Sequence, residues 1–133
     1  MDEHRLKSVP LFASLGRRER RRVAHVADMV DVREGKELLH QGSFAYEFMV
    51  IADGRAEVTR DGEHVADLGP GDVLGEIAAL ESGTRNASVT ARSPMSLIVM
   101  TAHDLRQLAA SIPELDRTLH AAADQRRPRA QSN

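Results

Sequence analysis

Residues 74–89 read LGEIAALESGTRNASV, and the interpretation of the fold depends on this stretch more than on any other. Gly75 interrupts a β-rich run, where a glycine lets another molecule approach the backbone closely. Ile77 to Glu81 can form one helical turn, whose free N–H groups attract anions. Arg85 follows, and its planar guanidinium suits a phosphate diester. Glu76 supplies a carboxylate that can hold a sugar diol, so this group of residues suits a ribose phosphate.

On both sides of this stretch, residues 28–100 alternate short β-rich runs with glycine. Asp53-Gly54 and Asp61-Gly62 are tight-turn pairs, because aspartate and glycine tolerate a positive φ. The predicted strands cover residues 29–32, 37–40, 47–51, 56–59, 64–68, 73–74, 87–91 and 97–100. Short strands at this spacing predict a mainly β fold, an eight-stranded antiparallel jelly roll or β-roll.

The two ends of the chain have a helical period instead. Apolar residues recur at spacings of three, four and eight from Leu11 to Val30, which predicts an N-terminal helix over residues 10–30. The β-roll is expected over residues 31–100. Two helices are expected over residues 102–125, with Pro113 between them. One domain therefore spans residues 1–125, and residues 126–133 are predicted to be a polar tail.

The composition is that of one ordinary globular domain. The chain has 133 residues, of which 41% are hydrophobic and 29% are charged, and it has no cysteine for disulfides or thiolate metal sites. The formal net charge of −2 gives no general attraction to nucleic acid or acidic membranes. We expect a cytoplasmic protein, because no apolar run approaches the roughly 18 residues of a membrane span. All but two of the 18 basic residues are arginine, and alanine is frequent, which suggests a bacterial, GC-rich genome.

Two further features of the sequence could indicate other functions. The run of Arg17, Arg18, Arg20, Arg21 and Arg22 is interpreted as a solvated helix face, with a phosphate-contacting patch as the alternative. The six histidines show no paired short spacing, and no recognisable nucleophile motif is present. We therefore expect no metal, no catalytic residue and no enzymatic activity.

The stretch 74–89 resembles the phosphate-binding cassette of cyclic-nucleotide-binding domains. These occur in bacterial catabolite-activator-like regulators, protein kinase A regulatory subunits and cyclic-nucleotide-gated channels. The family pattern is matched by Gly75, Glu76, Ile77, Ala78, Arg85, Ala87, Ser88 and Val89. Scaffold signals also match at Pro10-Leu11-Phe12, Gln41-Gly42 and Gly69-Pro70-Gly71-Asp72. The resemblance covers roughly residues 6–120.

This resemblance implies a role for each candidate site residue. Glu76, beside the Gly75 backbone, would accept hydrogen bonds from the ribose 2′-hydroxyl. Arg85 would pair with the cyclic phosphate, together with backbone N–H groups of Ala78 and Ala87. Val58 would pack against the purine. Leu74 and Ile77 belong to the same predicted binding segment, and the last helix, residues 114–125, would correspond to the lid.

Asn86 departs from the family pattern, because alanine at this position often accompanies cAMP binding and threonine or serine often accompanies cGMP binding. We expect cAMP rather than cGMP. The predicted function is a stand-alone sensor that shifts its C-terminal helices and so signals to an unidentified effector protein. Direct sequence-specific DNA binding is not expected, because the chain ends where catabolite-activator-like regulators begin a helix-turn-helix. The alternative is an interaction module that binds no nucleotide, with Glu76 and Arg85 as an ion pair.

Overall fold

The computed structural model describes residues 1–44, 46–74 and 84–126. A short 3₁₀-helix, η1 (Glu3–Ser8), and two α-helices, α1 (Pro10–Ala13) and α2 (Arg17–Val26), precede the strands. The strands are β1 (Asp28–Val32), β2 (Glu37–Leu39), β3 (Glu47–Asp53), β4 (Ala56–Arg60), β5 (Glu63–Leu68), β6 (Val73–Leu74), β7 (Ser88–Ala91) and β8 (Met95–Thr101). Two helices follow, α4 (Ala102–Ser111) and α5 (Pro113–Arg126).

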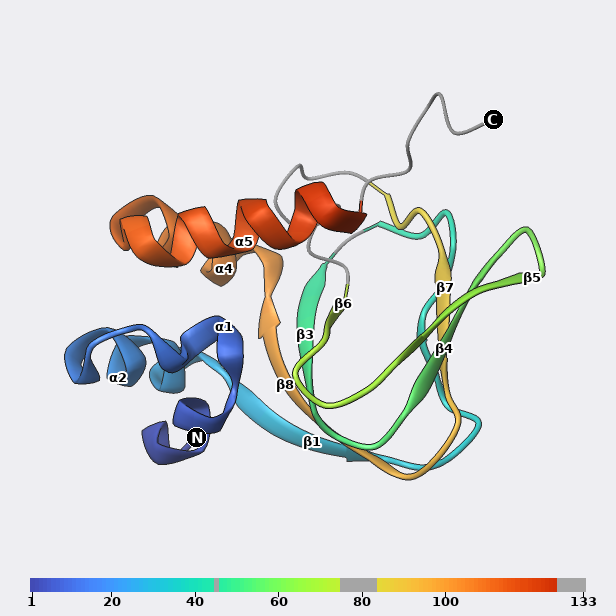
Figure 1. The fold of residues 1–133 in the computed structure, drawn as a ribbon, viewed down its shortest axis with the longest axis horizontal. Helices are drawn as coiled ribbons and strands as arrows, with labels where there is room; N and C mark the ends of the chain where they lie inside the picture. The colour runs from blue at the N-terminus through green and yellow to red at the C-terminus, as the bar shows by residue number, and fades with distance from the viewer. Residues whose placement is uncertain (45, 75–83, 127–133) are drawn as a thin grey trace.

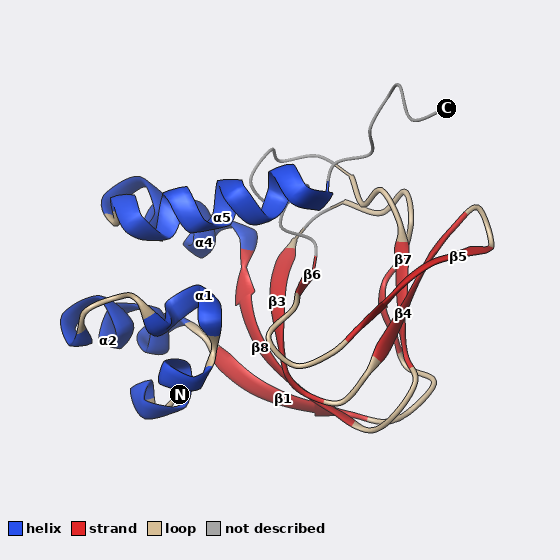
Figure 2. Cartoon of the chain, viewed as in Figure 1, coloured by secondary structure: helices blue, strands red, loops and turns tan. Residues whose placement is uncertain are grey.

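The eight strands form two four-stranded sheets, in the orders β1-β8-β3-β6 and β2-β7-β4-β5. Every pair of neighbouring strands is antiparallel. The helices of the described residues lie on one side of the first sheet, and the second sheet lies on the other side (Figures 1 and 2). The predicted eight-stranded antiparallel β-roll with flanking helices is confirmed.

Strands β3, β6 and β8 of the first sheet are buried on both faces, and the alternation of their side chains explains why. In β3, Phe48 and Val50 face the helices, whereas Met49 and Ile51 face the second sheet. Strands β6 and β8 alternate in the same way, so that a helix-facing core and an inner core share one sheet. The helix-facing core includes Leu105, Leu108, Leu115 and Leu119 of the two C-terminal helices. Since both cores meet in β3, this strand connects the inside of the β-roll to the helices.

The predicted single helix over residues 10–30 is wrong in its bounds. α1 ends at Ala13, and Gly16 has an extended backbone (φ −68°, ψ 165°) before α2 begins. The strand β1 then begins at Asp28, and Val30 pairs with Leu97. The apolar spacing is compatible with helix throughout, but the glycine interrupts it and pairing with β8 draws residues 28–32 into the sheet.

The two predicted tight turns have different roles. Asp61 (φ 54°) and Gly62 (φ 81°) both have positive φ and join the paired strands β4 and β5 as a two-residue hairpin. Gly54 (φ 97°) lies where the chain passes from β3 in the first sheet to β4 in the second.

The C-terminal helices follow β8 directly. The Thr101 side chain caps α4 by accepting a hydrogen bond from the Asp104 N–H. The two helices cover residues 102–126, close to the predicted range, and residues 127–133 of the predicted tail lie outside the described residues. Within the described part of the chain, no helix has both the length and the apolar character needed to cross a membrane.

Candidate functional site

Arg85 is the side chain predicted to pair with the phosphate, and it is 6% exposed. Two backbone hydrogen bonds fix it against the loop before β3. The Arg85 N–H donates to the Ser43 carbonyl at 2.8 Å, and the Gly42 N–H donates to the Arg85 carbonyl at 2.9 Å. An antiparallel bridge between Phe44 and Thr84 continues this pairing. The segment that carries Arg85 is therefore positioned by a loop more than 40 residues away in the sequence.

The Arg85 guanidinium points toward the start of β3, where its Nη2 donates to the Glu47 carbonyl. Arg85 and Glu47 both line a cavity of about 250 Å³, together with Phe44, Tyr46 and residues of β2. Phe44 is 67% exposed and Tyr46 is 74% exposed, and their ring centroids are 6.2 Å apart. A buried arginine thus lies at a cavity that is also lined by two exposed aromatic rings.

The residues after Arg85 are held by polar contacts that the sequence reasoning did not assign. Asn86 is exposed, and its carbonyl accepts a hydrogen bond from Arg60 Nε at 3.1 Å. The Ser88 hydroxyl accepts a hydrogen bond from the Gln41 N–H at 2.9 Å. The Gln41 side chain in turn bonds Asp61 twice, at 2.9 Å in each case. The sequence identifies Gln41 and Ser88 only as matches to the family pattern, whereas in the structure they attach the Arg85 segment to the roll.

Val58 and Leu74 lie in the inner core. Leu74 is 1% exposed, and Val58 is partly buried against the same cluster. Val58 lies opposite Val89 in the pairing of β4 with β7. Ala87, 6% exposed, immediately precedes β7. The structure therefore brings Val58 and Leu74 into one apolar cluster and keeps Arg85, Asn86 and Ala87 together before β7.

Gly75, Glu76, Ile77 and Ala78 lie outside the described residues. The predicted ribose contact of Glu76 and the alternative Glu76–Arg85 ion pair both depend on this segment, so both stay predictions. Among the residues that the structure does describe, no three histidine, aspartate or glutamate side chains gather as metal ligands.

The carboxyl groups whose pKa is lowered lie in other parts of the fold. A hydrogen bond from Arg20 lowers the pKa of Glu3, and Arg20 Nε lies 3.0 Å from Glu3 Oε2. Hydrogen bonds from Arg92, first, and from His64 lower the pKa of Glu57 on β4.

Arg20 is 9% exposed, so this member of the arginine run is not solvated as predicted, whereas Arg17, Arg18, Arg21 and Arg22 are exposed.

The comparison with known families gives one match that covers most of the described fold. A family model described as "Cyclic nucleotide-binding domain" matches residues 29–111. The match therefore includes β1 without its first residue, Asp28, and all of the strands β2 to β8. It also includes the Arg85 segment and the whole of α4.

Individual proteins are similar over comparable lengths. A cAMP-dependent protein kinase regulatory subunit of Schizosaccharomyces pombe is 34% identical over 96 residues, which are 71% of this chain and 23% of the relative. A cyclic nucleotide-gated potassium channel of Rhizobium etli is 30% identical over 120 residues, which are 90% of this chain and 34% of the channel. The chain thus spans about a quarter to a third of the length of these curated relatives.

Among solved structures, the catabolite activator protein of Thermus thermophilus superposes with a TM-score of 0.77 at 27% identity. That similarity covers 88% of this chain and 57% of the activator.

Proposed function

The chain belongs to the cyclic-nucleotide-binding domain family, and from this premise we propose that it binds cAMP and transmits binding to its C-terminal helices. The observation that carries the proposal is the position of Arg85. It is buried at a cavity, and the loop at residues 41–44 holds its backbone in place. A guanidinium fixed in this way can pair with a cyclic phosphate without losing much conformational freedom on binding.

The rest of the ligand is assigned by residue. We propose that Glu76, beside Gly75, accepts a hydrogen bond from the ribose 2′-hydroxyl, and that the Ala78 and Ala87 N–H groups assist Arg85. Ile77 belongs to the same segment. The apolar inner cluster with Val58 and Leu74 supports the placement of the purine there. Asn86, exposed next to Arg85, is proposed to set the preference between cAMP and cGMP.

A short chain of contacts supports transmission to the helices. Arg85 donates to the Glu47 carbonyl, and the next residue, Phe48, packs in the helix-facing core. The Ala102 N–H at the start of α4 donates to the Tyr46 carbonyl at 2.8 Å. A phosphate that competes for the Arg85 guanidinium changes the contacts of residues 46–47 and so favours one packing of α4 and α5.

Hydrogen exchange tests this step. We expect cAMP to change the exchange rates of the α4 amides, because the first of them bonds Tyr46. Bound cAMP with unchanged exchange in both α4 and α5 would contradict the proposed transmission and leave the binding proposal intact.

The proposed role is that of a sensor or regulatory domain and not of an enzyme, and its effector is a protein that recognises the shifted helices. We place it in a bacterial cytoplasm. The arginine- and alanine-rich composition supports the bacterial part of this proposal, as do the bacterial channel and the bacterial activator among the similar proteins.

One observation favours a second candidate, a module that keeps the fold and binds no nucleotide. The buried Arg85 guanidinium already has a protein acceptor in the Glu47 carbonyl, so its burial does not by itself require an anion. In this case the Arg85 segment would serve only to close the end of the roll.

Isothermal titration calorimetry with cAMP, cGMP and 5′-AMP separates the two candidates. The sensor proposal expects micromolar binding of cAMP, about −8 kcal/mol, and much weaker binding of the linear nucleotide. Asn86→Ala keeps the backbone carbonyl that Arg60 contacts, so it should alter the ratio of cAMP to cGMP affinity without unfolding the site. No heat and no thermal stabilisation with either cyclic nucleotide would favour the nucleotide-free module.

A further inference from the structure

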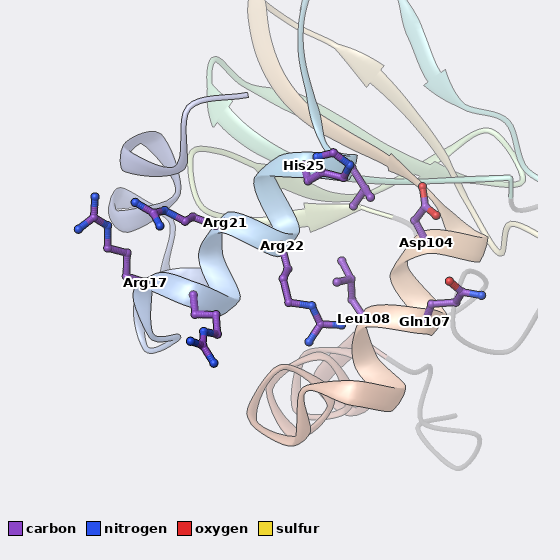
Figure 3. Close-up of a pocket in the computed structure, with 9 residues that line it drawn as sticks. Arg17, Arg21, Arg22, His25, Asp104, Gln107 and Leu108 are labelled. Atoms are coloured by element: carbon purple, nitrogen blue, oxygen red, sulfur yellow. The ribbon is translucent and has the colours of Figure 1, made fainter.

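A second cleft, with a volume of about 770 Å³, lies between the helices α2 and α4. Four arginines and His25 of α2 form one wall, and Asp104 and Gln107 of α4 form the other. Figure 3 shows Arg22 extending toward Leu108, whereas Arg17 and Arg21 extend outward from α2. Val26 and Leu108 add apolar surface between the two walls.

The cationic wall is a continuous stripe along α2. At 3.6 residues per turn, Arg17, Arg18, Arg21, Arg22 and His25 fall within about 140° of the helix circumference. The buried residues of α2, Arg20, Val23 and Ala24, occupy a separate arc. Like charges four residues apart repel each other on a helix, and positive charge in the first turn also opposes the helix dipole. The stripe therefore works against the stability of α2.

The described part of the chain does little to neutralise this stripe. Arg17 lies 3.6 Å from a Glu3 oxygen, and Arg22 donates to the Ser111 hydroxyl at 2.6 Å. Neither Arg18 nor Arg21 has a carboxylate within salt-bridge distance among the described residues. Arg20, by contrast, is buried and pairs with Glu3 at 3.0 Å. The fold thus uses one arginine of the run for its own packing and presents the others to solvent.

From this arrangement we infer that the cleft between α2 and α4 is a docking site for an acidic amphipathic segment of a partner protein. Carboxylates spaced by one helical turn would match the arginines, and an aliphatic side chain would contact Val26 and Leu108. Nucleic acid fits less well, because the described residues that line the cleft include no phenylalanine, tyrosine or tryptophan on which bases could stack. The overall net charge of −2 also disfavours a polyanion that would contact a larger surface.

Fluorescence anisotropy with a labelled model peptide tests the inference. The probe is a short helical peptide with glutamate at every fourth position and leucine beside it, and a matched peptide with lysine in place of glutamate is the control. A fluorescein-labelled oligo-dT is the third probe. The protein variants are Arg18→Glu/Arg21→Glu in the cleft and Arg33→Glu/Lys36→Glu at the exposed turn before β2, which change the net charge equally.

We expect saturable binding of the glutamate peptide that weakens between about 50 and 200 mM NaCl. The cleft variant should lose at least about tenfold in affinity, and the matched control less than about threefold. The readout is peptide binding alone, so this test does not depend on the proposed function. Absence of peptide binding, equal losses in the two variants, or tighter binding of oligo-dT than of the glutamate peptide would each overturn the inference.

Discussion

Among the described glycines, Gly54 is the position where a single methyl group should be most damaging, because the chain crosses there from one sheet to the other. Its φ is 97°, and a Cβ would lie 2.6 Å from the Pro94 carbonyl oxygen and 2.9 Å from the Met95 Cα. Both are backbone atoms, which cannot move away as a flexible side chain can. Gly62 is the matched control, because its φ is 81° and a Cβ there meets nothing within 4 Å.

The magnitudes separate the two substitutions. Alanine in a left-handed conformation costs about 1–2 kcal/mol, partly offset by the lower entropy of the unfolded chain, so Gly62→Ala should lose about 0.5–1 kcal/mol. Gly54→Ala adds an overlap with backbone that costs a further 1–3 kcal/mol or so, for a total of about 2–4 kcal/mol. Urea unfolding with a common slope measures the difference directly. Equal losses in the two variants would refute the close approach of residue 54 to β8.

The remaining predictions concern the helical layer. Arg20 lowers the pKa of Glu3, so their pairing stabilises the fold at pH values above the ordinary glutamate pKa. This stabilisation is lost as the pH falls through the lowered pKa of Glu3. Glu3→Gln should therefore reduce the Tm at neutral pH and bring it closer to that of wild type in acid, and a Tm difference that is the same at every pH would be inconsistent with this. Leu105→Ala, at a fully buried position, should cost about 2–5 kcal/mol, whereas Val65→Ala, at a position 45% exposed, should change stability by less than about 0.5 kcal/mol in urea unfolding.

The strands could be predicted from the sequence because their signals are local. Alternating apolar residues and turn pairs such as Asp61-Gly62 mark each strand within a few positions. The division of residues 10–30 was missed, because apolar spacing alone does not distinguish α2 from the start of β1, whose residue Val30 pairs with the distant Leu97.

The candidate site was predictable in part for the same reason. Arg85 and its neighbours stand in one contiguous motif, which sequence reasoning can recognise. The bond from the Arg85 guanidinium to the Glu47 carbonyl joins residues that are 38 positions apart. The bond from the Gln41 N–H to the Ser88 hydroxyl joins residues that are 47 positions apart. The Glu47 carbonyl and the Gln41 N–H are backbone groups without a side-chain signature, so only the folded structure reveals these contacts.

The central claim is that Arg85 binds a cyclic phosphate, and the affinity of Arg85 variants for cAMP tests it most directly. Arg85→Lys keeps the charge, Arg85→Ala removes it, and Arg33→Ala at an exposed position is the control, with thermal unfolding used to confirm that each variant folds. Calorimetric titration should show a loss of about 1.5–3 kcal/mol for Arg85→Ala, roughly ten- to a hundredfold in Kd, with a smaller loss for Arg85→Lys and none for Arg33→Ala. Wild-type affinity in a folded Arg85→Ala variant would contradict the account.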